Sequence, residues 1–76
     1  MLKIGKYQHF KGQFYQVLHL AKHSETEQWM VVYLPLYDNE HGKRDVWVRP
    51  LAMFDEIIER EGKKIKRFNY VGETDE

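Results

Sequence analysis

Short runs of aromatic and β-branched residues, separated by glycine or polar turns, dominate this sequence. The clearest runs are 14–20, 29–34 and 46–49. Residues of these types favour pleated strands over helices, and we expect Pro35 and Pro50 to end two of the runs because proline has no N–H to pair. A chain of 76 residues is enough for one domain. The pattern therefore predicts a single all-β domain, a small barrel or sandwich of five or six strands.

Two hairpins can be predicted from their turns. Gly12 separates the run 7–10 from the run 14–20, and glycine supplies the positive φ that a tight hairpin turn needs. The second hairpin turns at Glu61 and Gly62, which brings residues of opposite charge and two isoleucines face to face. Its predicted pairs are Arg60 with Lys63, Glu59 with Lys64, Ile58 with Ile65, Ile57 with Lys66, and Glu56 with Arg67.

Helical signals are weak and local. Residues 24–27 match a Ser-x-x-Glu capping box, but the β-branched run that follows has no helical spacing, so we interpret them as a turn. Residues 50–54 fit a single helical turn, because proline is well placed to open one. Residues 38–43 are a polar loop, which we expect to be the most mobile one. Order is expected over about 4–72, with a loose acidic tail at 73–76.

Charge and composition exclude several classes of protein. Lysine and arginine number 12, as do aspartate and glutamate, so a strongly basic nucleic-acid binder or a polybasic membrane anchor is disfavoured. The chain has no cysteine, which fits a reducing cytoplasm. Its first residues lack the apolar stretch of a signal peptide, and no run approaches the roughly 18 apolar residues of a membrane span. We therefore expect a cytoplasmic protein.

No catalytic or metal-binding motif is evident, and we predict neither a catalytic residue, a metal, a cofactor nor an enzymatic activity. His19 and His23 are four residues apart, which on a strand separates them by about 13 Å, too far to share one zinc ion. The single serine and both threonines lie in turns or in the tail. The four carboxylates between 55 and 61 alternate with apolar residues and face basic ones, which is typical of a solvated strand face.

The aromatic residues suggest a binding surface. Eleven rings in 76 residues are more than so small a domain can enclose, so some must lie at the surface. Trp47 and Arg49 share the face of a strand opposite Val46 and Val48, and aromatic residues with arginine are the usual anchors of interfaces. The alternative is that Trp47 caps the barrel while Arg49 packs along it. We predict a non-enzymatic module for a peptide or small polar ligand, with contacts from Tyr7, His9, Tyr33, Trp47 and Arg49.

Single-stranded nucleic-acid binding through the 55–70 hairpin is the alternative hypothesis. Basic side chains interleaved with aromatic ones grip phosphates and stack on bases. The neighbouring carboxylates reduce the positive field of the hairpin. Nucleic acid is therefore a less favoured partner than a peptide or small polar ligand. The residues concerned are Lys63, Lys64, Lys66, Arg67, Phe68 and Tyr70. A monomer is expected, although an exposed strand edge also leaves a weak homodimer open.

Several motifs together resemble a small bacterial family of unknown function. They are Tyr7 to Gly12 with the pattern Tyr-x-His-Phe-Lys-Gly, and Trp47 to Phe54 with the pattern Trp-Val-Arg-Pro-Leu-x-Met-Phe. The likeness spans about residues 5–73, and this chain departs from it in a longer polar loop at 38–44. The resemblance implies an SH3-like barrel in the cytoplasm. It implies no activity and no catalytic residue.

Overall fold

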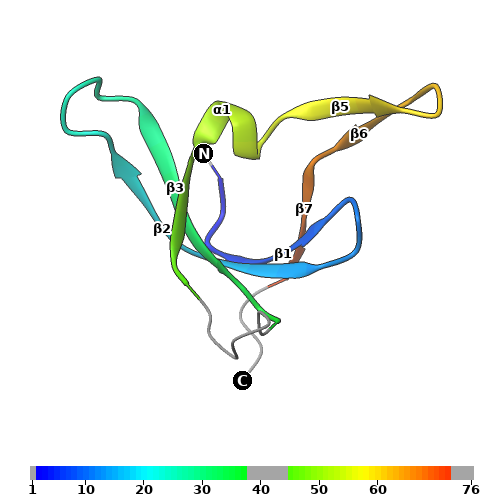
Figure 1. The fold of residues 1–76 in the computed structure, drawn as a ribbon, viewed down its shortest axis with the longest axis horizontal. Coiled ribbons are helices and arrows are strands. Elements are labelled where there is room, and N and C mark those ends of the chain that lie inside the picture. The colour runs from blue at the N-terminus through cyan, green and yellow to red at the C-terminus, as the bar shows by residue number, and fades with distance from the viewer. Residues whose placement is uncertain (1, 38–44, 73–76) are drawn as a thin grey trace.

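A computed structural model describes residues 2–37 and 45–72 of the chain. Over these residues it is an all-β fold with one short helical turn, as the sequence predicts (Figure 1). The expectations for the loop at 38–44 and for the tail at 73–76 fall outside the described residues. The elements are β1 (Gly5–His9), β2 (Phe14–Lys22), β3 (Trp29–Pro35), β4 (Trp47–Pro50), α1 (Leu51–Phe54), β5 (Ile57–Arg60), β6 (Lys63–Lys66) and β7 (Phe68–Gly72).

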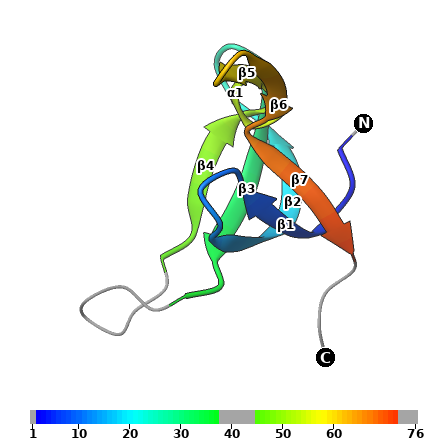
Figure 2. The ribbon, with the colours of Figure 1, turned by 90° about the vertical axis from the view of Figure 1, so that its right-hand side faces the viewer.

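Five of the strands form one antiparallel sheet in the order β4-β3-β2-β1-β7. The pairing shifts between Val17 and His19 where β2 meets β3, and between Lys6 and Tyr7 where β1 meets β7. Such bulges bend a sheet and increase its twist. Figure 2 shows the result, a curved sheet in which β7 crosses in front of β2 and β3.

The remaining two strands, β5 and β6, form a separate hairpin that projects beyond the sheet (Figure 1). The pairs predicted for residues 57–60 with 63–66 are confirmed, and the backbone N–H of Arg67 donates to the Glu56 carbonyl at 2.9 Å. Glu61 and Gly62 have φ of 53° and 78°, the left-handed conformation that a two-residue hairpin turn requires.

The chain bends at Arg67, which lies between the end of β6 and the start of β7. β7 then leaves β6 and pairs with β1, with His9 opposite Phe68. This division is why the described residues contain seven strands, one more than the upper number expected from the sequence.

The core is a cluster of aromatic rings with two valines. Phe54 is completely buried, and its ring stacks on Phe68 with the centroids 4.0 Å apart and an interplanar angle of 2°. Its edges meet Tyr7 and Tyr33 at 5.4 and 5.3 Å. One residue of the helical turn therefore contacts three strands. The buried hydrophobic side chains are Tyr7, Tyr15, Val17, Val31, Tyr33, Phe54 and Phe68.

We predict that Phe54→Ala lowers the free energy of unfolding by about 3–5 kcal/mol, the usual cost of removing a buried phenylalanine ring. This is close to the whole stability expected of a domain of this size. Met53→Ala, at a neighbouring position that is 51% exposed, should change stability by less than about 0.5 kcal/mol. Urea unfolding followed by tryptophan fluorescence measures both. Equal losses in the two variants would contradict the assignment of Phe54 as the centre of the core.

Candidate ligand-binding surface

Strand β4 directs its alternate side chains to opposite sides, as the sequence predicts. Val46, just before the strand, and Val48 are 57% and 62% exposed. Trp47 lies on the other side, where its ring meets the edge of the buried Tyr33 ring with a centroid separation of 6.1 Å. Trp47 nevertheless remains 45% exposed. It therefore both covers the core and offers ring surface to solvent.

Arg49 lies one step along the same face of β4. Its guanidinium carbon is 5.6 Å from the centroid of the Phe68 ring, and the residue is half-buried. Within the described residues, no carboxylate is within ion-pair distance of this guanidinium. The arginine is therefore held in place by an aromatic ring while its charge has no carboxylate partner there.

His9 ends β1 beside the same Phe68 ring, with the two centroids 4.9 Å apart. Its Nδ1 accepts a hydrogen bond from the backbone N–H of Lys11 at 3.1 Å. Burial lowers the pKa of His9 below its ordinary value of 6.5, and the nearby charges of Arg67, Arg49 and Lys11 lower it further. Three cationic side chains therefore lie around His9 at this end of the molecule.

His9, Trp47 and Arg49 together form what we call the cationic aromatic surface. All three are in contact with the buried rings of Tyr33 or Phe68, which fix their positions. The charged guanidinium of Arg49 beside an accessible indole ring suits a ligand that carries both a negative charge and an apolar group.

Two of the predicted contact residues lie beneath this surface. Tyr7 and Tyr33 are only 3% and 2% exposed, so they offer almost no area to a ligand. The Tyr7 hydroxyl donates to the Lys3 carbonyl at 2.7 Å, which satisfies its polar group in the core. Their positions in the structure are those of supporting core residues.

One exposed ring near the cationic aromatic surface was not among the contact residues predicted from the sequence. Tyr37 is 38% exposed, and its hydroxyl lies 3.1 Å from that of the buried Tyr15. The register of β2 with β3 places Tyr15 opposite Pro35 and so brings the two tyrosines together. The sequence carried no signal for this contact, because the register depends on the bulge in β2.

The residues of the alternative nucleic-acid hypothesis do not form one common face. Lys66 donates to Asp55 at 2.9 Å, and Arg67 pairs with Glu56. Phe68 is buried in the core, and the Tyr70 ring packs edge-on against Tyr7. Lys63 and Lys64 are exposed, so they are the basic residues of this set that remain open to a partner.

The part of the chain that the structure describes contains no cluster of three or more histidine, cysteine, aspartate or glutamate side chains able to hold a metal ion. None of its helices is long and apolar enough to cross a membrane.

Comparison with known proteins places the chain in a family. A model of the family described as "Protein of unknown function (DUF1653)" matches residues 5–70. The chain belongs to this family. A search of curated proteins gave no match.

A solved structure of the DUF1653 family has a similar fold. It is the crystal structure of a family member from Bordetella bronchiseptica, which is 33% identical, with a TM-score of 0.84 over 95% of this chain and 90% of that one. The resemblance to a bacterial family of unknown function is therefore confirmed. The family description assigns no activity to any residue of the cationic aromatic surface.

We predict that His9 makes the stability of the domain depend on pH. Because its pKa is lower in the folded state than the ordinary 6.5, the unfolded chain binds the proton more readily, and stability falls as the pH drops below about 6.5. His9→Asn should remove this part of the slope between pH 7.5 and 5.5, as measured by urea unfolding.

Two substitutions that each remove one positive charge test whether neighbouring cations lower the pKa of His9. Arg49→Gln removes one neighbouring cation and should reduce the slope, whereas Lys22→Gln removes a cation that is not among the neighbours of His9 and should leave the slope unchanged. A wild-type slope in His9→Asn would show that another group is responsible.

Proposed function

We propose that this protein is a non-enzymatic binding module. Its cationic aromatic surface binds a peptide or small polar ligand that carries a negative charge. The observation that carries the proposal is Arg49, a half-buried cation held over the Phe68 ring next to the exposed Trp47 ring. A guanidinium group binds carboxylates through paired hydrogen bonds, and tryptophan and arginine are the residues most often found at the centre of interfaces.

The surroundings of Trp47 support the proposal that this exposed ring, and not another, contacts the ligand. Phe14, Trp29 and Tyr70 each have a lysine ammonium over the ring, at 4.6, 5.1 and 5.2 Å. Within the described residues no cation lies over Trp47, whose recorded ring contact is the edge of Tyr33. Its exposed area is therefore available to an apolar group of the ligand, with Arg49 beside it for the charge.

We further propose that the fold is an SH3-like barrel and that the protein works in the cytoplasm as a monomer or weak homodimer. The curved five-stranded antiparallel sheet and the helical turn α1 support such a barrel. The absence of cysteine supports a reducing compartment.

The binding proposal can be tested by amide NMR titration with short extended peptides that contain glutamate, alongside the same peptides with glutamine. The acidic peptides are expected to shift residues 9, 47 and 49. Arg49→Gln and Trp47→Ala should each weaken binding about tenfold or more, as for other charge-assisted and aromatic anchors. Val48→Ala, on the other side of β4, should retain it.

The pH dependence of the binding affinity provides a second test, because His9 can become protonated. An anion beside His9 favours the protonated imidazole, so the affinity should rise as the pH falls from 7.5 to 5.5. Intact binding in a folded Trp47→Ala variant, or equal binding of the glutamate and glutamine peptides, would contradict the proposal.

Single-stranded nucleic-acid binding through residues 55–70 remains the alternative proposal, favoured by the exposed Lys63 and Lys64 on β6. It predicts that a short single-stranded RNA or DNA shifts amides of this hairpin, and that affinity falls steeply between 50 and 200 mM salt, roughly as the number of neutralised phosphates requires. Lys64→Gln should reduce the binding, while Lys22→Gln should not. Binding that ignores salt would exclude this alternative.

A further inference from the structure

Strand β4 lies at one edge of the five-stranded sheet, on the left of Figure 2. Among the described residues its backbone pairs with β3 alone. An edge strand directs every second pair of backbone N–H and C=O groups away from its neighbour, where an added strand can form hydrogen bonds with them. The outer side of β4 is therefore a surface on which a further strand can pair.

The register with β3 identifies the groups of β4 that point outwards. Pro50 lies opposite Met30 and has no N–H, so this pair is not hydrogen-bonded across the two strands. The two kinds of pair alternate in antiparallel strands, so Arg49 is hydrogen-bonded to Val31, whereas Val48 again lies in a pair without hydrogen bonds. The N–H and C=O of Val48 are thus directed toward the open edge.

A strand added at this edge places its side chains beside those of β4. Residues that face each other across antiparallel strands have Cβ atoms about 4.5–5.5 Å apart, on the same side of the sheet. The residues opposite Arg49 and Trp47 therefore both lie on the cationic aromatic surface. One meets a guanidinium that has no carboxylate partner among the described residues, and the other meets an exposed indole. The residue between them meets Val48 on the other side, which is 62% exposed.

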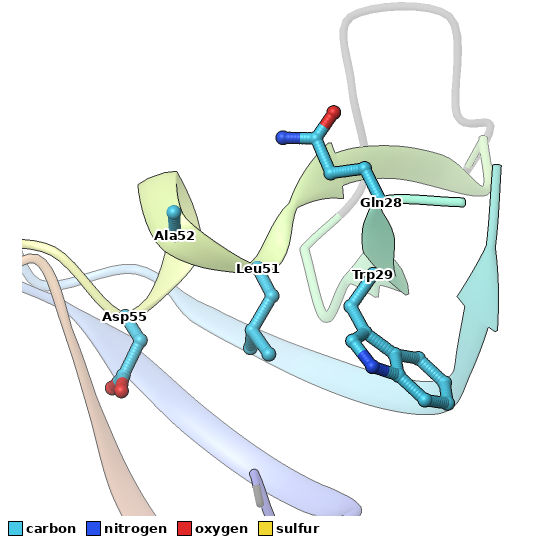
Figure 3. Close-up of a pocket in the computed structure, with 5 residues that line it drawn as sticks. All are labelled: Gln28, Trp29, Leu51, Ala52 and Asp55. Carbon is cyan, nitrogen blue, oxygen red and sulfur yellow. The ribbon is translucent and has the colours of Figure 1, made fainter. Parts of the chain in front are cut away.

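The helical turn α1 limits this edge at one end, because the chain leaves the sheet after Pro50. Beyond that point lies a pocket of about 350 Å³, which Figure 3 shows with its lining residues Gln28, Trp29, Leu51, Ala52 and Asp55. The carboxylate of Asp55 disfavours an anion there. An acidic ligand is therefore confined to β4 and the residue before it.

We propose that the ligand of this surface is an extended acidic peptide that adds to the sheet as an antiparallel strand beside β4. This inference rests on the proposed function and specifies how its ligand lies. All strand pairs in the described residues are antiparallel, and such pairs are slightly more stable than parallel ones. From its N-terminus the peptide then carries an acidic residue opposite Arg49, a β-branched residue opposite Val48 and an apolar residue opposite Trp47.

The order of these residues can be tested with two blocked peptides of the same composition in an amide NMR titration. They are acetyl-Thr-Glu-Val-Phe-Thr-amide and its reverse, acetyl-Thr-Phe-Val-Glu-Thr-amide. In the antiparallel direction the reversed peptide sets its glutamate opposite Trp47 and its phenylalanine opposite Arg49. The first peptide should therefore bind about threefold more tightly or better, in line with the energies of cross-strand pairs.

The backbone pairing can be tested by N-methylation of single peptide residues. The N–H of the central valine faces Val48, whereas that of the glutamate points away from β4. N-methylation of the valine should weaken binding about tenfold or more, and N-methylation of the glutamate should leave the affinity within about threefold. At saturation the Val48 amide should exchange its hydrogen about tenfold more slowly, while that of Arg49, already bonded to β3, should change little.

Each outcome decides the proposal. Loss of affinity on N-methylation of the valine, together with protection at Val48, would support it. Equal affinities of the two N-methylated peptides, with shifts still at Trp47 and Arg49, would overturn strand pairing and leave the proposed function intact. Absence of any shift at Trp47 and Arg49 with acidic peptides would overturn both. Protection of β7 in place of β4, or protection of Val48 that grows with protein concentration without peptide, would also overturn strand pairing with a peptide at β4.

Discussion

Phe54 and Phe68 stack face to face at 4.0 Å, and this contact joins the helical turn to the last strand. A helix of four residues is not stable by itself, so α1 depends on burying Phe54 among the rings of the sheet. The cationic aromatic surface depends on the same stack, because the Phe68 ring contacts both His9 and Arg49. The helical turn also places Leu51 and Asp55 at the pocket that Trp29 lines.

The features of the fold that could be predicted from the sequence are local in the chain. The register of β5 with β6 follows from two turn residues and the charges beside them, and the helical turn follows from Pro50. The pairing of β7 with β1 joins residues about 60 positions apart. No local pattern specifies such a pairing, because it is selected by the burial of rings such as Phe68 in the completed core.

For single side chains, too, only the local features could be predicted from the sequence. Alternation along β4 was enough to place Trp47 and Arg49 on one face. The same rule could not separate core tyrosines from surface ones, and Tyr7 and Tyr33 proved to be buried. The pocket lined by Gln28, Trp29, Leu51, Ala52 and Asp55 has no local signal in the sequence, because its residues come from the start of β3 and from α1, which are far apart in the chain.

Exposure of aromatic rings is by itself weak evidence for a binding site in a domain of this size. A chain of 76 residues buries only about 60% of the surface that it exposes when unfolded, so some rings remain outside whatever the function. The charged group that accompanies each ring is more informative. Trp47 stands beside a cation that lacks a carboxylate partner in the described structure, whereas Trp29 has the Lys22 ammonium over its ring, 5.1 Å from the centroid. Folding alone does not require an arginine without a carboxylate partner beside an exposed indole, so the charge beside Trp47 is the stronger sign of a ligand site.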